Sequence, residues 1–176
     1  MQKYLIAGSA LVVACGSGAG SDLADHRGGS VYDESVRTLQ FEDRDEGGTH
    51  LALPSDAVCN PYVRSYTVRV ADHQLAWQDC DRAADPEDGR AYTPHVGARA
   101  LSDAEWSTLE PTLTALAVSP GGPKRFADVG ILRLTVATDD GAREYRGDVV
   151  TCSPGQCIVN DALVDAMQAA RALAGK

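Results

Sequence analysis

The most reactive side chains in this sequence are its five cysteines. Cys59, Cys80, Cys152 and Cys157 lie in the body of the chain, and Cys15 stands apart near the N-terminus. Thiols can form disulfides, bind zinc or carry out redox exchange. Zinc sites usually contain paired Cys-x2-Cys ligands and redox sites a Cys-x-x-Cys motif, and neither spacing is present here. In an oxidising compartment, disulfides are therefore the favoured chemistry.

The N-terminus indicates such a compartment. One cation, Lys3, precedes an apolar run from Tyr4 to Ala14 that is too short to span a bilayer. The residues Val12-Val13-Ala14-Cys15 resemble the lipobox of bacterial lipoproteins. The resemblance implies that residues 1–14 are a signal peptide and that the Cys15 sulfur carries lipid, with palmitate among its acyl chains. The alternative is a hydrophobic N-terminal strand with an incidental cysteine.

The same resemblance implies a location. Gly16, in place of an aspartate after the lipidated cysteine, implies the outer membrane of a bacterium with two membranes, facing the periplasm or the cell surface. Residues 15–30 are rich in Gly and Ser and are expected to form a flexible tether. Residues 31–176 are long enough for one domain with its own core.

If Cys15 carries lipid, four cysteines remain, and four cysteines allow three pairings. We expect Cys59 to pair with Cys80 and Cys152 with Cys157, because each pair brackets a local unit of structure. In the loop-entropy model these closures contribute roughly 3 and 2 kcal/mol. A four-cysteine zinc site is the alternative.

The formal net charge of −9 disfavours nucleic acid as a partner, since a polyanion is repelled. The sequence contains no Lys/Arg cluster that suggests an anionic-lipid patch. Membrane attachment is therefore expected through the lipid on Cys15 alone.

Alternating residues in the first half of the chain predict strands. Val36 to Phe41 is a candidate first strand, and residues 62–78 form a hairpin with Asp72-His73 at its turn. Trp77 is expected to anchor the buried face of the sheet. Tyr92 to Leu101 contains Pro94 and Gly97, which indicates an edge strand or an irregular segment.

The second half predicts a helix, a hairpin and a final helix. Ser102-Asp103-Ala104-Glu105 is a capping box, and Pro111 is expected to kink or split the helix after it. Ile131 to Thr138 and Arg143 to Val150 form a hairpin around Asp139-Asp140-Gly141. Asn160 or Asp161 is expected to cap the last helix. This order predicts an α+β fold, an antiparallel sheet built from hairpins with two helices packed on one face.

No recognisable catalytic constellation is present in the sequence. Gly-x-Ser-x-Gly, phosphate-binding glycine loops and His-Glu-x-x-His are absent. The acidic run from Glu42 to Gly48 fails the EF-hand spacing. Asp139 and Asp140 could act as an acid and base pair, but the turn explains both. We expect no catalytic residue, no cofactor and no metal. The histidines, which are expected to be solvated, are His26, His50, His73 and His95.

Three functions are compatible with these features. The first is a non-catalytic binding or accessory domain that contacts an envelope protein or peptide, for which an exposed apolar sheet face would be a mark. The second is a protease inhibitor. The segment from Phe126 to Cys152 resembles the C-terminal hairpin of the subtilisin-inhibitor family, and Lys124-Arg125-Phe126 would then lie in the inhibitory loop. The third is an enzyme whose site is assembled from distant residues.

Overall fold

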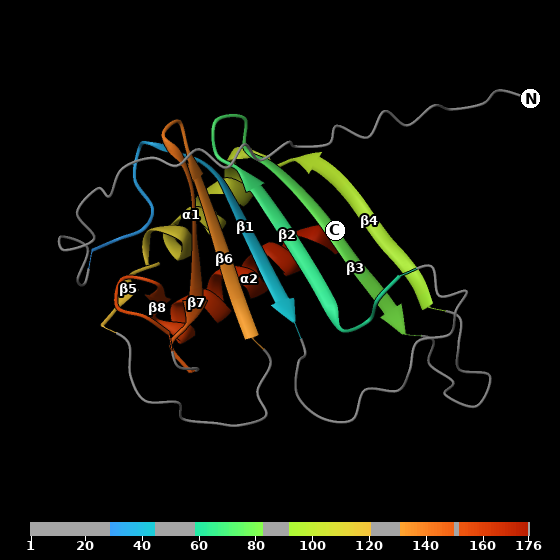
Figure 1. Ribbon diagram of the computed structural model, residues 1–176. Coiled ribbons are helices and arrows are strands. Elements are labelled where there is room, and N and C mark those ends of the chain that lie inside the picture. The colour runs from blue at the N-terminus through green and yellow to red at the C-terminus, as the bar shows by residue number, and fades with distance from the viewer. Residues whose placement is uncertain (1–28, 45–58, 83–91, 121–130, 150–151, 176) are drawn as a thin grey trace, which may run out of the picture.

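The computed structural model describes residues 29–44, 59–82, 92–120, 131–149 and 152–175, whose strands form one eight-stranded sheet (Figure 1). The strand order is β4-β3-β2-β1-β6-β7-β8-β5. The helices α1 (Asp103–Thr114) and α2 (Asn160–Ala174) both lie behind the same face of this sheet (Figure 1). The predicted α+β class is therefore confirmed. The strands are β1 (Val36–Arg44), β2 (Val63–Arg69), β3 (Gln74–Arg82), β4 (Tyr92–Ala100), β5 (Val118–Ser119), β6 (Ile131–Thr138), β7 (Gly141–Gly147) and β8 (Cys157–Ile158).

The hydrophobic core fills the space between the sheet and the helices. In the central strand, Phe41 lies opposite Tyr66 on one side and Leu134 on the other, and all three side chains are buried. Successive side chains of a strand point to opposite faces, so the alternate residues of each strand enter this core. The helices contribute buried residues at helical spacing, namely Trp106, Leu109 and Leu113 from α1 and Leu163, Ala166, Ala170, Leu173 and Ala174 from α2.

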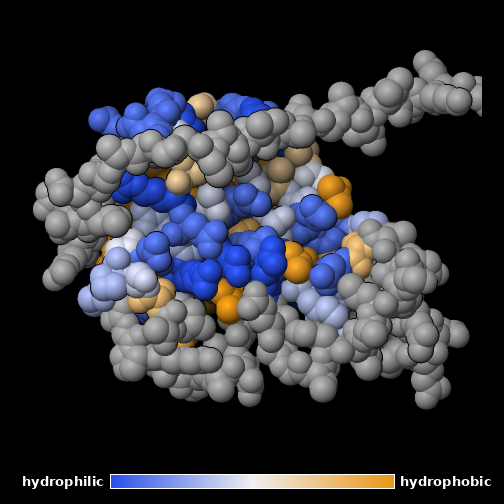
Figure 2. Space-filling view, in the orientation of Figure 1, coloured by the Kyte–Doolittle hydropathy of each residue, from blue (hydrophilic) through white to orange (hydrophobic). Residues whose placement is uncertain are grey.

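The opposite face of the sheet, called the open face because neither described helix lies on it, is hydrophilic over its centre (Figure 2). The register places Gln40 beside Thr67 and Thr135 on this face. Further along β1, the Arg44 Nε donates to Glu42 Oε1 at 2.6 Å. Among the described residues the exposed large hydrophobic side chains are Val96 and Val159, so these residues form no broad apolar patch on this face. The open face thus lacks the mark that would identify it as an apolar docking surface.

The predicted β2–β3 hairpin is present, and its turn is held against α1. His73 adopts a positive φ of 47°, the left-handed conformation that this turn requires. Its imidazole stacks on the indole of Trp106 with ring centroids 4.1 Å apart and planes 7° apart. The expectation that His73 is a solvated residue is therefore wrong, because its ring is half-buried against the Trp106 indole.

Two further features of β3 and β4 agree with the sequence. Trp77 packs against the core cluster, as predicted for an anchor of the buried face. Its indole lies across Gly97 of the neighbouring strand, where a Cβ would overlap the ring. β4 is the edge strand of the sheet, again as predicted.

The β6–β7 hairpin also forms, with a shorter turn than predicted. Asp139 and Asp140 make the two-residue turn, and Gly141 already pairs with Thr138 at a φ of 137°. β7 ends at Gly147 rather than at Val150, which lies outside the described residues. No pattern in the sequence predicts the short strands β5 and β8, and β8 pairs with β7 in parallel.

The start of α1 confirms the capping box. Glu105 N donates to Ser102 Oγ at 3.4 Å, and Ser102 N donates to Glu105 Oε2 at 3.0 Å. The expectation that Pro111 would split the helix is wrong, since α1 continues to Thr114. Pro111 is exposed and lies in the last turn, so the carbonyl that loses its helical donor faces solvent.

Glu105 also connects three elements of the fold. Arg99 of β4 donates to both Glu105 oxygens, at 2.8 and 2.9 Å, and to the Leu173 carbonyl near the end of α2 at 2.9 Å. The hydrogen bond from Arg99, together with those from Ser102, lowers the pKa of Glu105 from 4.5 to about 2. Folding therefore favours the ionised form of Glu105.

The Glu105→Gln variant should lose stability in a pH-dependent way. Because the folded-state pKa is depressed, the contribution of Glu105 is complete above about pH 4.5 and is lost as the pH falls towards 2. Urea unfolding of the wild type and the variant from pH 2 to 7 should give a difference in unfolding free energy that shrinks below pH 4.5. Glu34→Gln, at an exposed position, is the control and should leave the profile unchanged. A difference between Glu105→Gln and the wild type that is constant across this range would contradict the assignment.

Candidate functional site

A cavity of about 540 Å³ opens between the segment before β1 and the β6–β7 hairpin. This volume lies within the range typical of small-ligand pockets, roughly 300–1,000 Å³. Its apolar lining comes from four valines that also belong to the core, Val31, Val36, Val118 and Val136. Polar groups surround the lining, so the cavity combines an apolar floor with a polar rim. In Figure 1 the segment that forms one wall curves past the turn of the hairpin.

Hydrogen bonds to β5 and the residues before it hold the first wall. Val31 N donates to the Leu116 carbonyl and Val118 N donates to the Gly29 carbonyl, each at 3.0 Å. Ser30 forms an isolated antiparallel bridge with Ala117. Gly29 and Ser30, which the composition places at the end of the tether, are therefore bonded to the sheet. Because backbone bonds tie this wall in place, the cavity has a fixed shape at that side.

The hairpin supplies the second wall and most of the polar groups. Arg143 lies opposite Val136 and Tyr145 opposite Leu134, so both project to the helix-covered side of the sheet. Tyr145 is buried, yet its hydroxyl makes no hydrogen bond within the described part of the chain. Arg143 forms no ion pair or hydrogen bond with any described residue. The cavity thus has a donor and a cation that the described fold itself does not use.

The acidic groups near the rim differ in their pairing. Arg37 donates to both oxygens of Asp139, and this contact lowers the pKa of Asp139. Asp33 accepts from the Ser35 N–H at 2.8 Å and the Ser35 hydroxyl at 2.6 Å. The Asp140 carboxylate has no such contact among the described residues. Within the described ranges, this rim therefore carries one unpaired anion beside the unpaired cation of Arg143.

A second cavity of about 500 Å³ lies beside the Cys152–Cys157 loop. Its charged lining consists of Glu144 and Arg146, which face each other at 3.7 Å. Because these two charges are already paired, we take the cavity at the β6–β7 hairpin as the candidate site.

A row of charged residues crosses the helix-facing side of the sheet near its other end. Arg64 Nε lies 3.3 Å from Asp79 Oδ1, and Arg64 Nη1 lies 3.5 Å from Asp43 Oδ2. The Tyr66 hydroxyl donates to Asp79 Oδ2 at 3.0 Å, and Cys80 N donates to Oδ1 at 2.7 Å. Burial, and then the bond to the Asp79 carboxylate, raises the pKa of Tyr66. The buried carboxylate is satisfied within the fold, which indicates a structural role.

The cysteines of the body pair as expected. Cys59 bonds to Cys80 and Cys152 bonds to Cys157, with Cα atoms 5.8 and 5.7 Å apart. The first disulfide joins the open end of the β2–β3 hairpin, and the second closes the loop between β7 and β8. Cys15, His26 and His50 lie outside the described residues.

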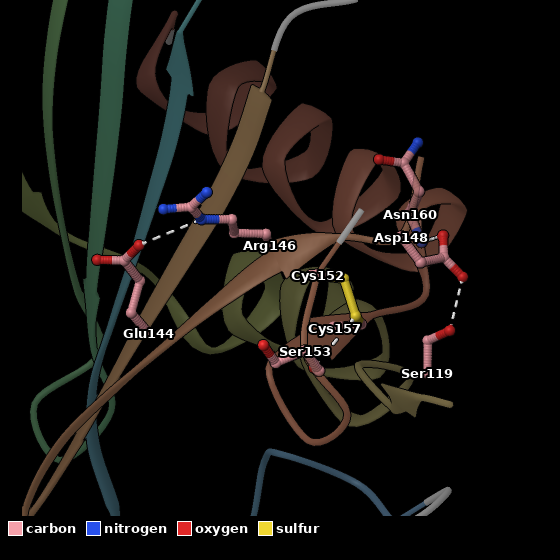
Figure 3. The surroundings of a disulfide bond; sticks show 8 residues. All are labelled: Ser119, Glu144, Arg146, Asp148, Cys152, Ser153, Cys157 and Asn160. Carbon is pink, nitrogen blue, oxygen red and sulfur yellow. Dashed lines mark hydrogen bonds and ion pairs between the residues drawn. A yellow bond between two sulfur atoms is a disulfide. The ribbon is translucent and has the colours of Figure 1, made fainter. Parts of the chain in front are cut away.

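The region around the second disulfide contains the cap of α2 (Figure 3). Asp148 Oδ1 accepts from the Asn160 N–H at 3.1 Å, and Asp148 Oδ2 accepts from the Ser119 hydroxyl at 2.8 Å. The expectation that Asn160 or Asp161 caps this helix is wrong. Val159 occupies the N-cap position and has no side-chain acceptor, so a carboxylate from the end of β7 replaces it.

The cavity escapes sequence reasoning because its walls come from distant segments. In the sequence, Asp140 is explained as part of a turn, and nothing in the spacing of Arg143 and Tyr145 distinguishes them from other strand residues. The signal available is weak, an arginine and a tyrosine in alternation on one strand face.

His95, expected to be solvated, is half-buried, with its ring centroid 5.8 Å from that of Trp77.

The sequence also raises three other candidates, a metal site, a membrane-spanning segment and an inhibitory loop. Within the described ranges, no group of three or more His, Cys, Asp or Glu side chains converges as a metal site would. Neither described helix has the length and apolar composition needed to cross a membrane. Lys124-Arg125-Phe126, the inhibitory loop of the inhibitor hypothesis, lies outside the described residues.

Comparisons with protein-family models, with curated proteins and with solved structures found no match to this chain. The assignment of the candidate site therefore rests on the fold and the cavity of this structure alone.

Replacing Asp148 with alanine should destabilise the protein by about 1–2 kcal/mol, because the α2 amide and the Ser119 hydroxyl both lose their acceptor. Urea unfolding at neutral pH measures the change. The matched control is Asp161→Ala, which removes an exposed first-turn acid and should cost less, about 0.3–1 kcal/mol. Equal losses in the two variants would show that Asp148 does not act as the cap.

Proposed function

We propose that this chain is a lipid-anchored, non-catalytic binding domain of the bacterial cell envelope, and that the cavity at the β6–β7 hairpin is its binding site. The observation that carries the binding role is the cavity itself, with an apolar floor and unpaired polar groups on its rim. In ligand sites apolar side chains remove part of the ligand from water, and polar groups orient it.

The disulfides support the envelope location. Both pairs close within the domain and together use Cys59, Cys80, Cys152 and Cys157. Disulfides persist in exported proteins and are rare where thiols are kept reduced. Cys15 is the remaining cysteine of the sequence, and the lipobox-like residues before it make it the site of lipidation. In this proposal lipid holds the chain on the outer membrane.

The pairing of polar groups supports a non-catalytic role. Asp79 and Tyr66 are buried ionisable residues of the described fold, and they bind each other and, through Asp79, Arg64. A general base must be free to accept a proton from substrate, and the Asp79 carboxylate is instead held by Tyr66 and Arg64. The unpaired Asp140 carboxylate on the cavity rim is assigned to ligand binding in this proposal. At the cavity rim, Arg143 and Tyr145 provide hydrogen-bond donors that suit recognition of a ligand.

Cys15→Ser should abolish acylation and release the protein from the membrane fraction. Cells given radiolabelled palmitate should label the wild type and leave this variant unlabelled, because the thiol that carries the lipid is gone. The Cys152→Ser, Cys157→Ser double variant is the control and should keep the label. Label on Cys15→Ser, or none on the wild type, would refute the anchor.

Binding to the cavity can be followed by NMR on the full chain carrying Cys15→Ser. The probes are 3-methyl-1-butanol, 4-methylpentanoate, 3-methylbutylamine and leucine, which share a branched apolar body and differ in charge. At least one should shift amide resonances of residues 30–36 and 136–145 and spare those of β2 and β3. If none of the four shifts these resonances, the cavity is not a binding site.

A further inference from the structure

The two unpaired charges on the rim indicate which class of ligand this cavity would hold, if it has the binding role proposed above. Arg143 and Asp140 lie three positions apart on one hairpin, and both line the cavity. No ion pair joins them, and neither side chain is paired with any other described residue. The neighbouring acids Asp33 and Asp139 are already bonded, to Ser35 and Arg37.

We propose that the cavity binds a small zwitterion with an apolar side chain, of the class of a free aliphatic α-amino acid. Arg143 takes the carboxylate and Asp140 takes the ammonium group. The valine floor takes the aliphatic side chain. The Tyr145 hydroxyl, which has no partner in the described fold, donates a second hydrogen bond to the carboxylate.

Charge complementarity favours this class over a ligand with a single charge. A monocarboxylate would gain Arg143 but would meet repulsion from Asp140 on the same hairpin. A monoamine would gain Asp140 and meet repulsion from Arg143. A zwitterion satisfies both groups at once, and its apolar part is removed from water by Val31, Val36, Val118 and Val136.

The size and construction of the cavity agree with this ligand. Its volume of about 540 Å³ accommodates a small molecule together with water on the open side. The hairpin turn that contains Asp140 is joined to the start of β1 by the Arg37–Asp139 ion pair. In this pair, Arg37 Nη2 lies 2.6 Å from Asp139 Oδ2. The two charges are thus presented from one short hairpin whose position relative to the valine floor is set by strand pairing.

The test compares leucine with its two half-ligands, 4-methylpentanoate and 3-methylbutylamine, by NMR titration of the full chain carrying Cys15→Ser. Leucine should bind about tenfold more tightly than either, as expected for one additional hydrogen-bonded charge contact. Arg143→Gln should weaken leucine and 4-methylpentanoate about tenfold and should not weaken the amine, which is freed from repulsion by Arg143. Asp140→Asn should weaken leucine and the amine and should not weaken the acid, which is freed from repulsion by Asp140.

Two matched variants control for general effects of removing a charge from this hairpin. Arg146→Gln removes an arginine of the same strand, and Glu144→Gln removes an acid of the same strand. Both side chains lie on the open face of the sheet, away from the valine floor, since they alternate with Arg143 and Tyr145. Both variants should leave leucine binding unchanged.

If a half-ligand binds as tightly as leucine, or if Asp140→Asn has no effect on leucine, the zwitterion assignment is overturned while the cavity remains a binding site. If none of the probes shifts the cavity resonances, both the assignment and the binding role fail.

Discussion

The pairing of β1 on both of its edges is the constraint on which the rest of this structure depends. β1 joins β2 on one side and β6 on the other, so it connects the strands of the first half of the sheet to those of the second. Phe41, between Tyr66 and Leu134, is the centre of the core at this junction. The segment before β1 is hydrogen-bonded to β5 and to the residue Leu116 before it. The Arg37–Asp139 pair joins residues 102 positions apart. The register of β1 therefore determines where the two walls of the cavity meet.

The placement of both helices on one face divides the sheet into two environments. On the covered face, a charged side chain loses water and needs partners, and Asp79 obtains them from Tyr66, Arg64 and the backbone of Cys80. On the open face, polar residues such as Gln40 stay hydrated. The cavity lies at a boundary between these environments, beside the hairpin turn. That position lets buried valines and exposed charges line the same space.

Much of the fold could be predicted from the sequence because its signals are local. Alternation predicted the β2–β3 and β6–β7 hairpins, and Ser102 with Glu105 predicted the start of α1. The cysteine pairs could be inferred from local units of structure. The strands β5 and β8 contain two residues each, too few to show a period, and the two strands pair with each other across 40 residues, between Val118 and Ile158. The cap of α2 escapes prediction for the same reason, since Asp148 lies 12 residues before Asn160.

The candidate site is less predictable than the fold. Its polar groups come from a turn and a strand, where charged residues normally face solvent, and its floor comes from valines whose sequence context shows only that they are apolar. Only the three-dimensional arrangement reveals that Arg143, Asp140 and Tyr145 border one space. The position of Pro111 is similarly ambiguous in sequence, because its effect on a helix depends on how many turns come after it.

The central position of β1 also bears on how the chain acquires its structure. A chain synthesised from its N-terminus completes β1 to β4 before β6 exists, and β1 then presents an unpaired edge beside the apolar Leu39 and Phe41. Such an edge is a template for pairing with another chain. Contacts of large sequence separation also slow folding, which prolongs this exposure. The strand that unites the finished sheet is thus the one that most needs shielding while the nascent chain waits for its second half.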